Sequence, residues 1–521
     1  MKNLLKDKKN ILILLITIGV QICLLFSLAA KKEGYFIDEV LSFSLANREG
    51  TGYFEPPVHV WTDPTWYLQN MTAQEGHLFD FNIPYNNQVQ DVSPPLFYAL
   101  LHGVCSLFPG QLSHWMGIGL NTFFYIGCIV LMYFLGTSLL KNKKAGLLIA
   151  FLFGITYGAL NCALFLRMYM QATFMLLLHV FVYVHYLESE KVPKIGYALF
   201  VVSAVLGSLT QYYFLIGAVC LGVWHVISLL HKKQYFNIIK YLIAAVVSGV
   251  LALSIFPAML RHILKSGRGT ASFDSLANGE NLLDPYKETF RILNDQMFGG
   301  FLLLLIAVLL IGHLYFVFRK KDPVLLEGRS WIPVAVAAIG YFVVVTKVAP
   351  YQTDRYIMPV YPLAYLLIVC GTYKFIEKLV RSDKALLICL VLFGTISISQ
   401  LINMPFHYLY VGYNQQNVAE EYTDDYCVVI SDNHGYWYYD LQALTQYKSF
   451  FWLMDTENES LIENITEKVF PEGEFVLYGR NTWSEQEIVD YIHKNFGDNW
   501  ICDKQAACSH ERFVIYHCYQ K

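Results

Sequence analysis

Long apolar runs separated by short polar segments fill most of the first 403 residues. A helix needs roughly 20 apolar residues to cross a bilayer. Runs of this kind predict spans at 11–30, 113–140, 145–165, 169–187, 236–260, 298–318, 331–348, 356–376 and 385–403. The longer run 195–230 predicts two further spans that meet near Gln211. The pattern therefore predicts a polytopic α-helical membrane protein with about 11 to 12 transmembrane helices.

One apolar stretch, 95–108, is too short for a comfortable span. It opens on Pro94-Pro95, and if it crossed together with 113–140, the basic segment 141–144 would lie outside. Basic loops stay in the cytoplasm. We therefore predict that 95–108 is an interfacial or re-entrant helix along the outer surface, with a short true span as the alternative.

Basic residues at the span ends indicate the orientation. The N-terminus is placed inside by Lys2, Lys6, Lys8 and Lys9. The first apolar run is longer than the core of a typical signal peptide, which favours a retained span. The acidic loop that follows, 31–93, is then external. We expect a multi-pass protein of the cell membrane with its catalytic loop, 31–110, outside the cytoplasm.

The tail, 404–521, is polar and has strand-like runs at 427–431, 475–479 and 512–518. A helix-like segment follows Ser484, with Glu487 in the capping-box position. Alternating strands and helices predict a small extracytoplasmic α/β domain after a membrane domain of residues 1–403. One or two disulfides are expected in this tail from the set Cys427, Cys502, Cys508 and Cys518.

Composition narrows the class of function. The chain is 55% hydrophobic and 15% charged, far from a soluble globular protein. A net charge of −3 and the lack of a basic domain give no reason to expect nucleic acid as a partner. The sequence has no Walker loop, no nucleotide-binding glycine fingerprint and no metal-ligand cluster. A nucleotide sugar is therefore not the expected donor, and no metal ligand is predicted.

Two groups of residues carry candidate chemistry. Asp38-Glu39 follow the first span, where a carboxylate can act as general base at the interface; a solvated acidic pair is the alternative. Arg167 and Arg355 stand at span ends, where a guanidinium can hold a phosphate. The alternative for both arginines is a snorkelling membrane anchor.

The segment from Asp91 to Pro95 precedes the short helix. Asp91 could be a ligand-binding residue or the cap of that helix, and Pro suits a helix start. His102, on the helix itself, could bind substrate or could be satisfied within the fold.

Four motifs stand in order along the chain: Asp38-Glu39, D-x-x-P-P-L-x-Y from Asp91, R-M-Y from Arg167 and R-Y-x-x-P-x-x-P from Arg355. Together they resemble the GT-C superfamily of membrane glycosyltransferases. The most similar branch holds the protein O-mannosyltransferases and aminoarabinose transferases, a group described as family 39-like. The resemblance covers roughly residues 10–400, and the tail lies outside it.

The resemblance implies a GT-C fold and transfer of a sugar from a polyprenyl-phosphate carrier, without a metal or other cofactor, usually with inversion. It implies that Asp38 is the general base, with Glu39 beside it. The implied substrate-binding residues are Asp91, Ser93, Pro94, Pro95, His102, Arg167, Tyr169, Tyr212, Tyr213, Arg355 and Tyr356. This chain departs from the usual pattern at Ser93, Leu166 and Gln211, and these departures bear on the acceptor.

The sequence thus predicts an envelope glycosyltransferase that uses a polyprenyl-phosphate sugar, with undecaprenyl phosphate as the expected carrier. Its partners would be that donor, the lipid bilayer and an envelope protein, lipid or polymer as acceptor. Two alternatives remain at this point: a flippase or transporter of lipid-linked sugars, and a non-catalytic envelope scaffold whose tail binds a partner.

Overall fold

The structure is a computed structural model that describes residues 8–50, 52, 57–189, 191–277, 283–320, 330–409, 413–433 and 437–521. Lys2 and Lys6, used above for orientation, lie outside these residues. Contacts divide the chain into two compact units. Unit 1 comprises the described residues of Met1–Leu28, Val92–Phe97 and Gly117–Phe406, and unit 2 those of Ala29–Asp91, Tyr98–Met116 and His407–Lys521.

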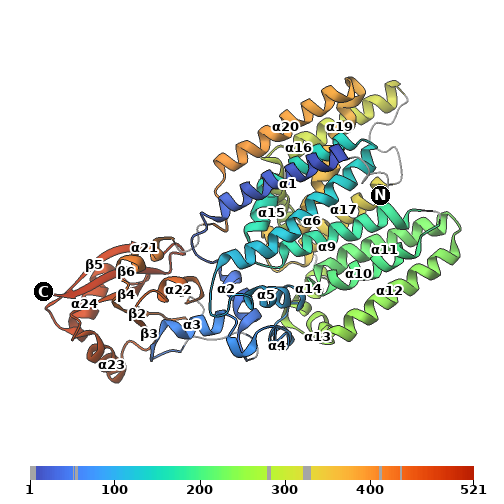
Figure 1. The fold of residues 1–521 in the computed structure, drawn as a ribbon. Helices are drawn as coiled ribbons and strands as arrows, with labels where there is room; N and C mark the ends of the chain where they lie inside the picture. The colour runs from blue at the N-terminus through green and yellow to red at the C-terminus, as the bar shows by residue number, and fades with distance from the viewer. Residues whose placement is uncertain are drawn as a thin grey trace. The chain divides into compact units, whose positions relative to one another are not determined.

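Unit 1 is helical and multi-pass (Figure 1). Among the described residues, eight helical segments are long and apolar enough to cross a membrane. They are α1 (Lys8–Ala29), α6 (His114–Leu140), α9 with η2 (Tyr169–Leu187), α11 (Tyr213–His231), α12 (Tyr235–Ile255), α17 (Trp331–Val348), α18 to α19 (Asp354–Leu379) and α20 (Ser382–Asn403). The remaining helices of this unit include α10 (Lys194–Ser208), α13 (Ala258–Leu264) and α14 (Gly267–Ala277).

Two bent helix pairs raise the number of candidate spans to ten at most within the described residues. The pair α7 (Lys143–Gly154) and α8 (Tyr157–Leu164) bends by 56°, and the pair α15 (Leu283–Phe298) and α16 (Leu302–Tyr315) by 85°. The predicted 11 to 12 spans are therefore too many for this part of the chain.

Local chemistry explains the lower number. Thr156 caps α8 by accepting a hydrogen bond from the Ala159 N–H at 3.3 Å, so the run 145–165 restarts as a second helix. Gly299 and Gly300 have φ of 57° and 90°, which turns the chain sharply before α16. The first half of 195–230 forms α10, which has only 15 residues.

Other predictions for the membrane segments are confirmed. The run 195–230 breaks between Ser208 and Tyr213, as the polar residues there indicated. The segment 95–108 forms α5 (Leu96–Cys105), a helix of 10 residues. Its placement along the outer surface stays a prediction.

Small and polar side chains join the helices of unit 1. A Cβ on Gly146 of α7 would lie 2.7 Å from the Tyr133 carbonyl oxygen of α6, so only glycine fits. The Gln21 side chain of α1 donates to the carbonyl oxygens of Ala150 and Phe151 in α7, at 3.1 and 2.8 Å. Where lipid cannot solvate polar groups, such bonds fix which helices pack together.

Unit 2 is built on a six-stranded mixed sheet in the order β1-β3-β2-β4-β6-β5. The strands are β1 (Trp61–Thr62), β2 (Tyr426–Ile430), β3 (Ser449–Leu453), β4 (Glu474–Arg480), β5 (Trp500–Ala507) and β6 (Phe513–Gln520). Strand β2 pairs in parallel with β3 and β4, and the other pairs are antiparallel. Its helices include α2 (Ile37–Asn47), α3 (Pro64–Met71), α4 (Asn82–Gln90), most of α5, α21 (Tyr413–Glu421), α22 (Trp437–Leu444), α23 (Glu459–Val469) and α24 (Glu485–Phe496).

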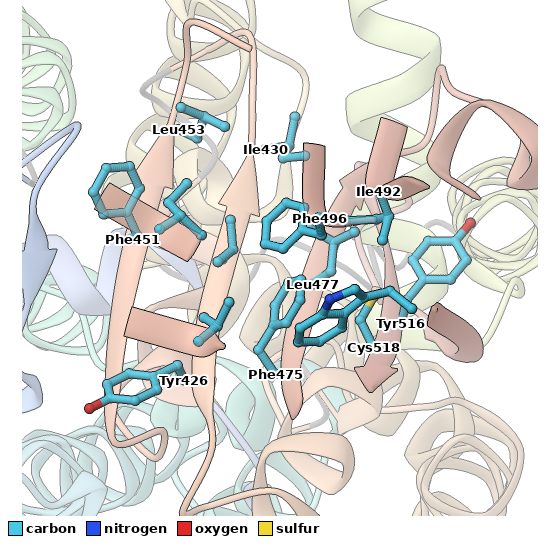
Figure 2. Packing of buried hydrophobic residues seen from close by; sticks show 14 of the residues in the cluster. Tyr426, Ile430, Phe451, Leu453, Phe475, Leu477, Ile492, Phe496, Tyr516 and Cys518 are labelled. Atoms are coloured by element: carbon cyan, nitrogen blue, oxygen red, sulfur yellow. The ribbon is translucent and has the colours of Figure 1, made fainter. Parts of the chain in front are cut away.

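The predicted α/β tail is confirmed. Its three strand-like runs form β2, β4 and β6, and the capping box of Ser484 and Glu487 starts α24. Ile488, Ile492 and Phe496 recur every four residues and put one apolar face of α24 on the sheet (Figure 2). Burying a side chain such as Phe496 stabilises the unit by about 2 kcal/mol.

The sheet contains three strands that the sequence pattern did not predict, namely β3, β5 and β1, and β1 comes from the first loop. Trp61 and Thr62 of the first loop pair with Phe451 and Phe450 of β3. The Trp61 ring packs edge-on against Phe451, with centroids 5.4 Å apart. By its contacts the first loop thus belongs with the tail, whereas the sequence analysis grouped it with residues 1–403. Where the functional boundary lies stays a prediction.

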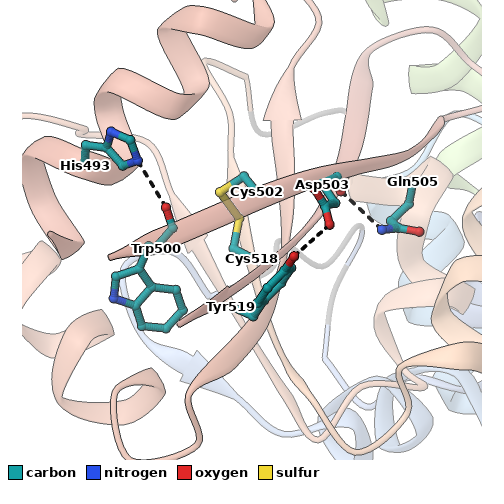
Figure 3. The surroundings of a disulfide bond; sticks show 7 residues. All are labelled: His493, Trp500, Cys502, Asp503, Gln505, Cys518 and Tyr519. Atoms are coloured by element: carbon teal, nitrogen blue, oxygen red, sulfur yellow. Dashed lines mark hydrogen bonds between the residues drawn. A yellow bond between two sulfur atoms is a disulfide. The ribbon is translucent and has the colours of Figure 1, made fainter. Parts of the chain in front are cut away.

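One disulfide joins β5 and β6, between Cys502 and Cys518 (Figure 3). Closing a loop of this length stabilises a fold by about 3 kcal/mol in the chain-entropy account. Within the described residues, Cys427 and Cys508 are buried free thiols. The expectation of at least one disulfide in the tail is confirmed.

Candidate functional site

The adjacent acids Asp38 and Glu39 open helix α2 in unit 2, in different surroundings. Glu39 is buried, and its two oxygens lie 3.0 and 3.1 Å from the Lys32 Nζ. The Phe36 N–H also donates to the Glu39 carboxylate at 2.8 Å, and the Glu39 N–H donates to the Phe36 carbonyl at 2.8 Å. Lys32 donates further to the Tyr408 carbonyl. Glu39 is therefore built into the fold.

Asp38 is half-buried, one residue before this ion pair. Successive helix positions point about 100° apart, so Asp38 does not share the direction of Glu39. Its own backbone is held by the Ser42 hydroxyl, which donates to the Asp38 carbonyl at 2.8 Å. The first turn of α2 thus fixes the main chain at Asp38. Of the two acids, Asp38 is therefore the more exposed.

Asp91 and His102 are both deeply buried in unit 2. Asp91 ends α4, where its N–H donates to the Asn87 carbonyl at 2.9 Å. It is therefore the C-cap residue of α4, and the following helix begins five residues later, at Leu96. The His102 Nδ1 lies 3.1 Å from the Asn47 side-chain oxygen, and burial lowers the pKa of this histidine. His102 is thus only half satisfied within the fold, because its buried Nε2 has no hydrogen-bond partner among the described residues.

Ser93, Pro94 and Pro95 are buried in unit 1, just before α5. The Leu96 N–H donates to the Leu209 carbonyl at the end of α10, at 3.0 Å. This bond ties the two-proline segment to the turn that leads into Tyr212 and Tyr213.

Three motifs that are far apart in the sequence meet in unit 1 around Tyr356. The Tyr356 ring packs edge-on against Tyr213 and Tyr169, with centroids 5.5 and 6.5 Å away. The Arg355 guanidinium lies 5.2 Å from the centre of the same ring. The Tyr341 hydroxyl donates to the Tyr356 carbonyl at 3.0 Å. We call Tyr169, Tyr213, Tyr341, Arg355 and Tyr356 the aromatic–arginine cluster.

Residues around the cluster supply further polar groups. Arg167 is buried, and its backbone N–H donates to the Phe165 carbonyl at 2.7 Å. The Phe165 ring stacks on Tyr169 at 5.5 Å. The Tyr212 hydroxyl lies 2.8 Å from the Nδ1 of His262 in α13. His262 is buried, and no sequence motif singled it out.

Beside Arg355, the sequence analysis missed a buried acid, Asp354. Its Oδ2 accepts from the Asn161 side chain at 3.1 Å and from the Gln296 side chain at 3.0 Å. Tyr361 in turn donates to the Gln296 oxygen at 2.9 Å. A buried ionisable residue in a membrane domain is itself a signal of function, and Asp354 in the T-D-R-Y segment could have been found that way.

Two groups of side chains in the described part of unit 2 could hold a metal ion: Asp440, Cys508 and His510, and Asp425, Glu474 and His517. In the first group both His510 nitrogens are engaged. The Nε2 lies 2.9 Å from Asp440, and the Nδ1 accepts from the Arg512 N–H at 3.1 Å. A neutral imidazole that binds a metal through Nε2 keeps a proton on Nδ1, so this ring would have to give up the Arg512 bond.

Comparisons with known proteins give structural similarity only. No protein-family model and no curated protein matches the chain. The crystal structure of ArnT from Cupriavidus metallidurans bound to undecaprenyl phosphate has a TM-score of 0.48 and 11% identity, covering 96% of this chain and 97% of that one. An Archaeoglobus fulgidus oligosaccharyltransferase tethered with an acceptor peptide has a TM-score of 0.43 and 12% identity, covering 98% and 74%.

The chain is therefore similar over nearly its full length to these two solved structures. With TM-scores below 0.5 and identities this low, the similarity assigns neither a family nor an activity to this chain. The arrangement of the side chains carries the functional inference instead. Unit 1 offers a cation beside aromatic hydroxyls, and unit 2 offers a half-buried carboxylate on a fixed helix start.

Proposed function

We propose that this protein is a membrane glycosyltransferase that takes a sugar from a polyprenyl phosphate and transfers it to an envelope acceptor on the external face. One observation carries the proposal. The R-M-Y motif at Arg167, the tyrosine pair at Tyr212 and the R-Y motif at Arg355 are nearly 200 residues apart at most, yet Tyr169, Tyr213 and Tyr356 pack as one cluster. A binding site needs such convergence of distant segments, whereas separate membrane anchors do not need it.

The aromatic–arginine cluster suits a lipid-linked phosphate. A guanidinium offers paired N–H donors that match phosphate oxygens. The tyrosine rings offer an apolar wall for a prenyl chain, together with hydroxyl groups for the sugar. When the sugar leaves, the phosphate passes from one negative charge to two. A cation fixed beside it stabilises that change, and such stabilisation is often the largest contribution to catalysis.

Asp38 is assigned the role of general base. The acceptor hydroxyl or amine attacks the anomeric carbon from the face opposite the phosphate, so the configuration inverts. The bond from that carbon to the phosphate oxygen breaks and its electron pair leaves with the polyprenyl phosphate. Asp38 takes the acceptor proton. Glu39 is assigned a positioning role, because Lys32 and the Phe36 N–H already occupy its carboxylate.

A flippase of lipid-linked sugars is the competing function, and one substitution separates the two. Asp38→Asn removes the base but keeps the shape. An enzyme then loses transfer and keeps donor binding, whereas a flippase continues to move the donor across the bilayer.

A scaffold is the third possibility, and deletion of 404–521 would not isolate it. Strand β3, which pairs with β1 of the first loop, lies in the deleted segment, as does the Tyr408 carbonyl that binds Lys32. Deletion would therefore disturb the start of the loop that carries Asp38.

The test uses the full chain reconstituted in liposomes with a sugar-loaded polyprenyl phosphate and an envelope extract as acceptor. Mass spectrometry measures released polyprenyl phosphate and new glycan together. Wild type should yield both products, and Asp38→Asn should yield neither. Glu75→Gln, which changes an exposed acid of the same loop, should match wild type. Mass spectrometry of envelope glycans from cells with and without the gene then names sugar and acceptor. An unchanged glycan profile would count against the proposal.

A further inference from the structure

The turn that joins α19 (Tyr361–Leu379) to α20 forms a pocket of about 480 Å³. It is lined by Lys378, Leu379, Val380, Arg381 and Lys384. Three of these five side chains are basic, and this lining set contains no acid. The pocket lies wholly within unit 1 and plays no part in the function proposed above.

The two acids of the same segment are matched by cations that do not line the pocket. Glu377 accepts from the Lys374 Nζ at 3.0 Å. Asp383 lies 3.2 Å from the Lys144 Nζ. Surface pairs of this kind contribute little to stability, and the three basic residues of the lining belong to neither pair.

The backbone adds to this charge. Helix α20 is 22 residues long and begins at Ser382, with Arg381 as its N-cap, and no side chain among the described contacts caps it. The first N–H groups of a helix attract anions. The start of α20 is also held in place, because the Ser382 hydroxyl lies 2.6 Å from the Tyr373 hydroxyl and 3.3 Å from the Asn142 amide nitrogen.

The position of the turn indicates which anion reaches it. The helices on either side, within Asp354–Leu379 and Ser382–Asn403, are both candidate spans. A short turn between two spans lies at a bilayer surface, the level of the lipid phosphates. Leu379 and Val380 supply an apolar edge that a phosphate in solution does not need.

We propose that this pocket binds the phosphate of an anionic glycerophospholipid headgroup. The three basic side chains hold the phosphate oxygens, the α20 N-terminus adds donors, and Leu379 and Val380 contact the start of the acyl chains. Basic residues at span ends also serve as topology signals and snorkelling anchors, but that role requires neither saturable binding nor a choice among lipids.

Native mass spectrometry of the detergent-solubilised full chain tests the proposal. Separate arms add phosphatidylglycerol, phosphatidylcholine or inorganic phosphate. Lys378→Gln/Arg381→Gln/Lys384→Gln is compared with Lys191→Gln/Lys194→Gln/Lys240→Gln, which removes three exposed cations elsewhere in unit 1. Wild type and the control should retain phosphatidylglycerol, and the pocket variant should bind it at least about ten-fold more weakly.

Arg381→Gln alone guards against misfolding of the triple variant and should weaken binding by about five-fold. Equal loss in the pocket and control triples would overturn the proposal, because a diffuse basic surface would then explain the binding. Equal retention of phosphatidylcholine would overturn it too. If inorganic phosphate displaced the lipid at equal concentration, the site would be one for free phosphate and the lipid assignment would fail.

Discussion

Two charged dipeptides, Asp38-Glu39 in unit 2 and Asp354-Arg355 in unit 1, have the same pattern of burial. In each pair one acid is buried and tied to the fold, while its neighbour is half-buried. The buried acids differ in what stabilises them. Glu39 has a cation, Lys32, at 3.0 Å. Asp354 has two neutral amides, those of Asn161 and Gln296, at 3.1 and 3.0 Å.

This difference indicates what each buried acid does. An ion pair as buried as Lys32–Glu39 is costly to break from one side, because the remaining charge is left uncompensated. The Asn161 and Gln296 amides hold the Asp354 carboxylate in place as neutral donors. Glu39 therefore secures the main chain beside Asp38, whereas Asp354 joins the start of its helix to α8 and α15.

The largest effect is expected from Asp38→Asn. Loss of a general base lowers turnover by about 1,000-fold. The free energy of unfolding should stay within about 0.5 kcal/mol of wild type, because Asp38 is only half-buried. Transfer assays and urea denaturation of the same preparation measure the two quantities. A large loss of stability would show that both acids of the pair are structural.

Glu39→Gln should show the opposite pattern, with a loss of about 3 kcal/mol in stability because Lys32 is left buried without its partner. The double variant Lys32→Met/Glu39→Met should recover most of that loss. Denaturation curves of the three proteins provide the comparison. If Glu39→Gln instead abolished turnover in a fully stable protein, Glu39 would be a catalytic residue, as the motif resemblance allowed.

Arg355→Lys should lower kcat/KM by about 100-fold, since lysine keeps the charge but loses the planar pair of donors. Lys287→Gln, an exposed cation of α15, is the control and should be neutral. Kinetics with varied donor concentration make the measurement. Full activity in Arg355→Lys would indicate that only charge, or only anchoring, is needed at this position.

Asp354→Asn should have a smaller effect, a loss of about ten-fold in kcat/KM, because an amide oxygen can replace only part of what the carboxylate accepts. If Asp354 acts by positioning Arg355, this variant added to Arg355→Lys should cost less than the sum of the two. Strict additivity in the double-mutant cycle would show that the two residues act independently.

The smallest effect is expected from a change at a third acid, Asp425 in unit 2. Its surroundings differ from those of Glu39 and from those of Asp354. Burial and the nearby Glu474, Asp424 and Glu472 raise the pKa of Asp425 to about 6, although His517, 3.7 Å away, opposes this. The folded state then binds a proton that the unfolded state releases near pH 4. Stability from this group is present at low pH and is lost as the pH rises through about 6.

Asp425→Asn should therefore stabilise the sheet relative to wild type at pH 7.5 and change little at pH 4. Hydrogen exchange of peptides from β2 and β6 at the two pH values reports the difference. The exposed neighbour provides the control, and Asp424→Asn should show a smaller pH dependence. A stabilisation that is the same at both pH values would exclude the titration of Asp425 as its cause.

Much of unit 1 follows from local pattern. Hydrophobic runs long enough to span a bilayer are readable without a partner, so α1, α6, α17 and α20 begin and end close to the predicted positions. The bends were harder to foresee. Thr156 and the pair Gly299-Gly300 lie inside apolar runs, and whether such residues break a helix depends on what packs around them.

The sequence by itself determined that this is a multi-pass chain with an α/β tail, and it supplied the motifs at Asp38, Arg167 and Arg355. Only the tertiary structure decided that Glu39 and Asp354 are anchors, that β1 joins the tail's sheet, and that Tyr169, Tyr213 and Tyr356 meet. The reason is physical. Apolar periodicity is local, but the burial of a charge depends on partners such as Tyr408 for Lys32, 376 residues away.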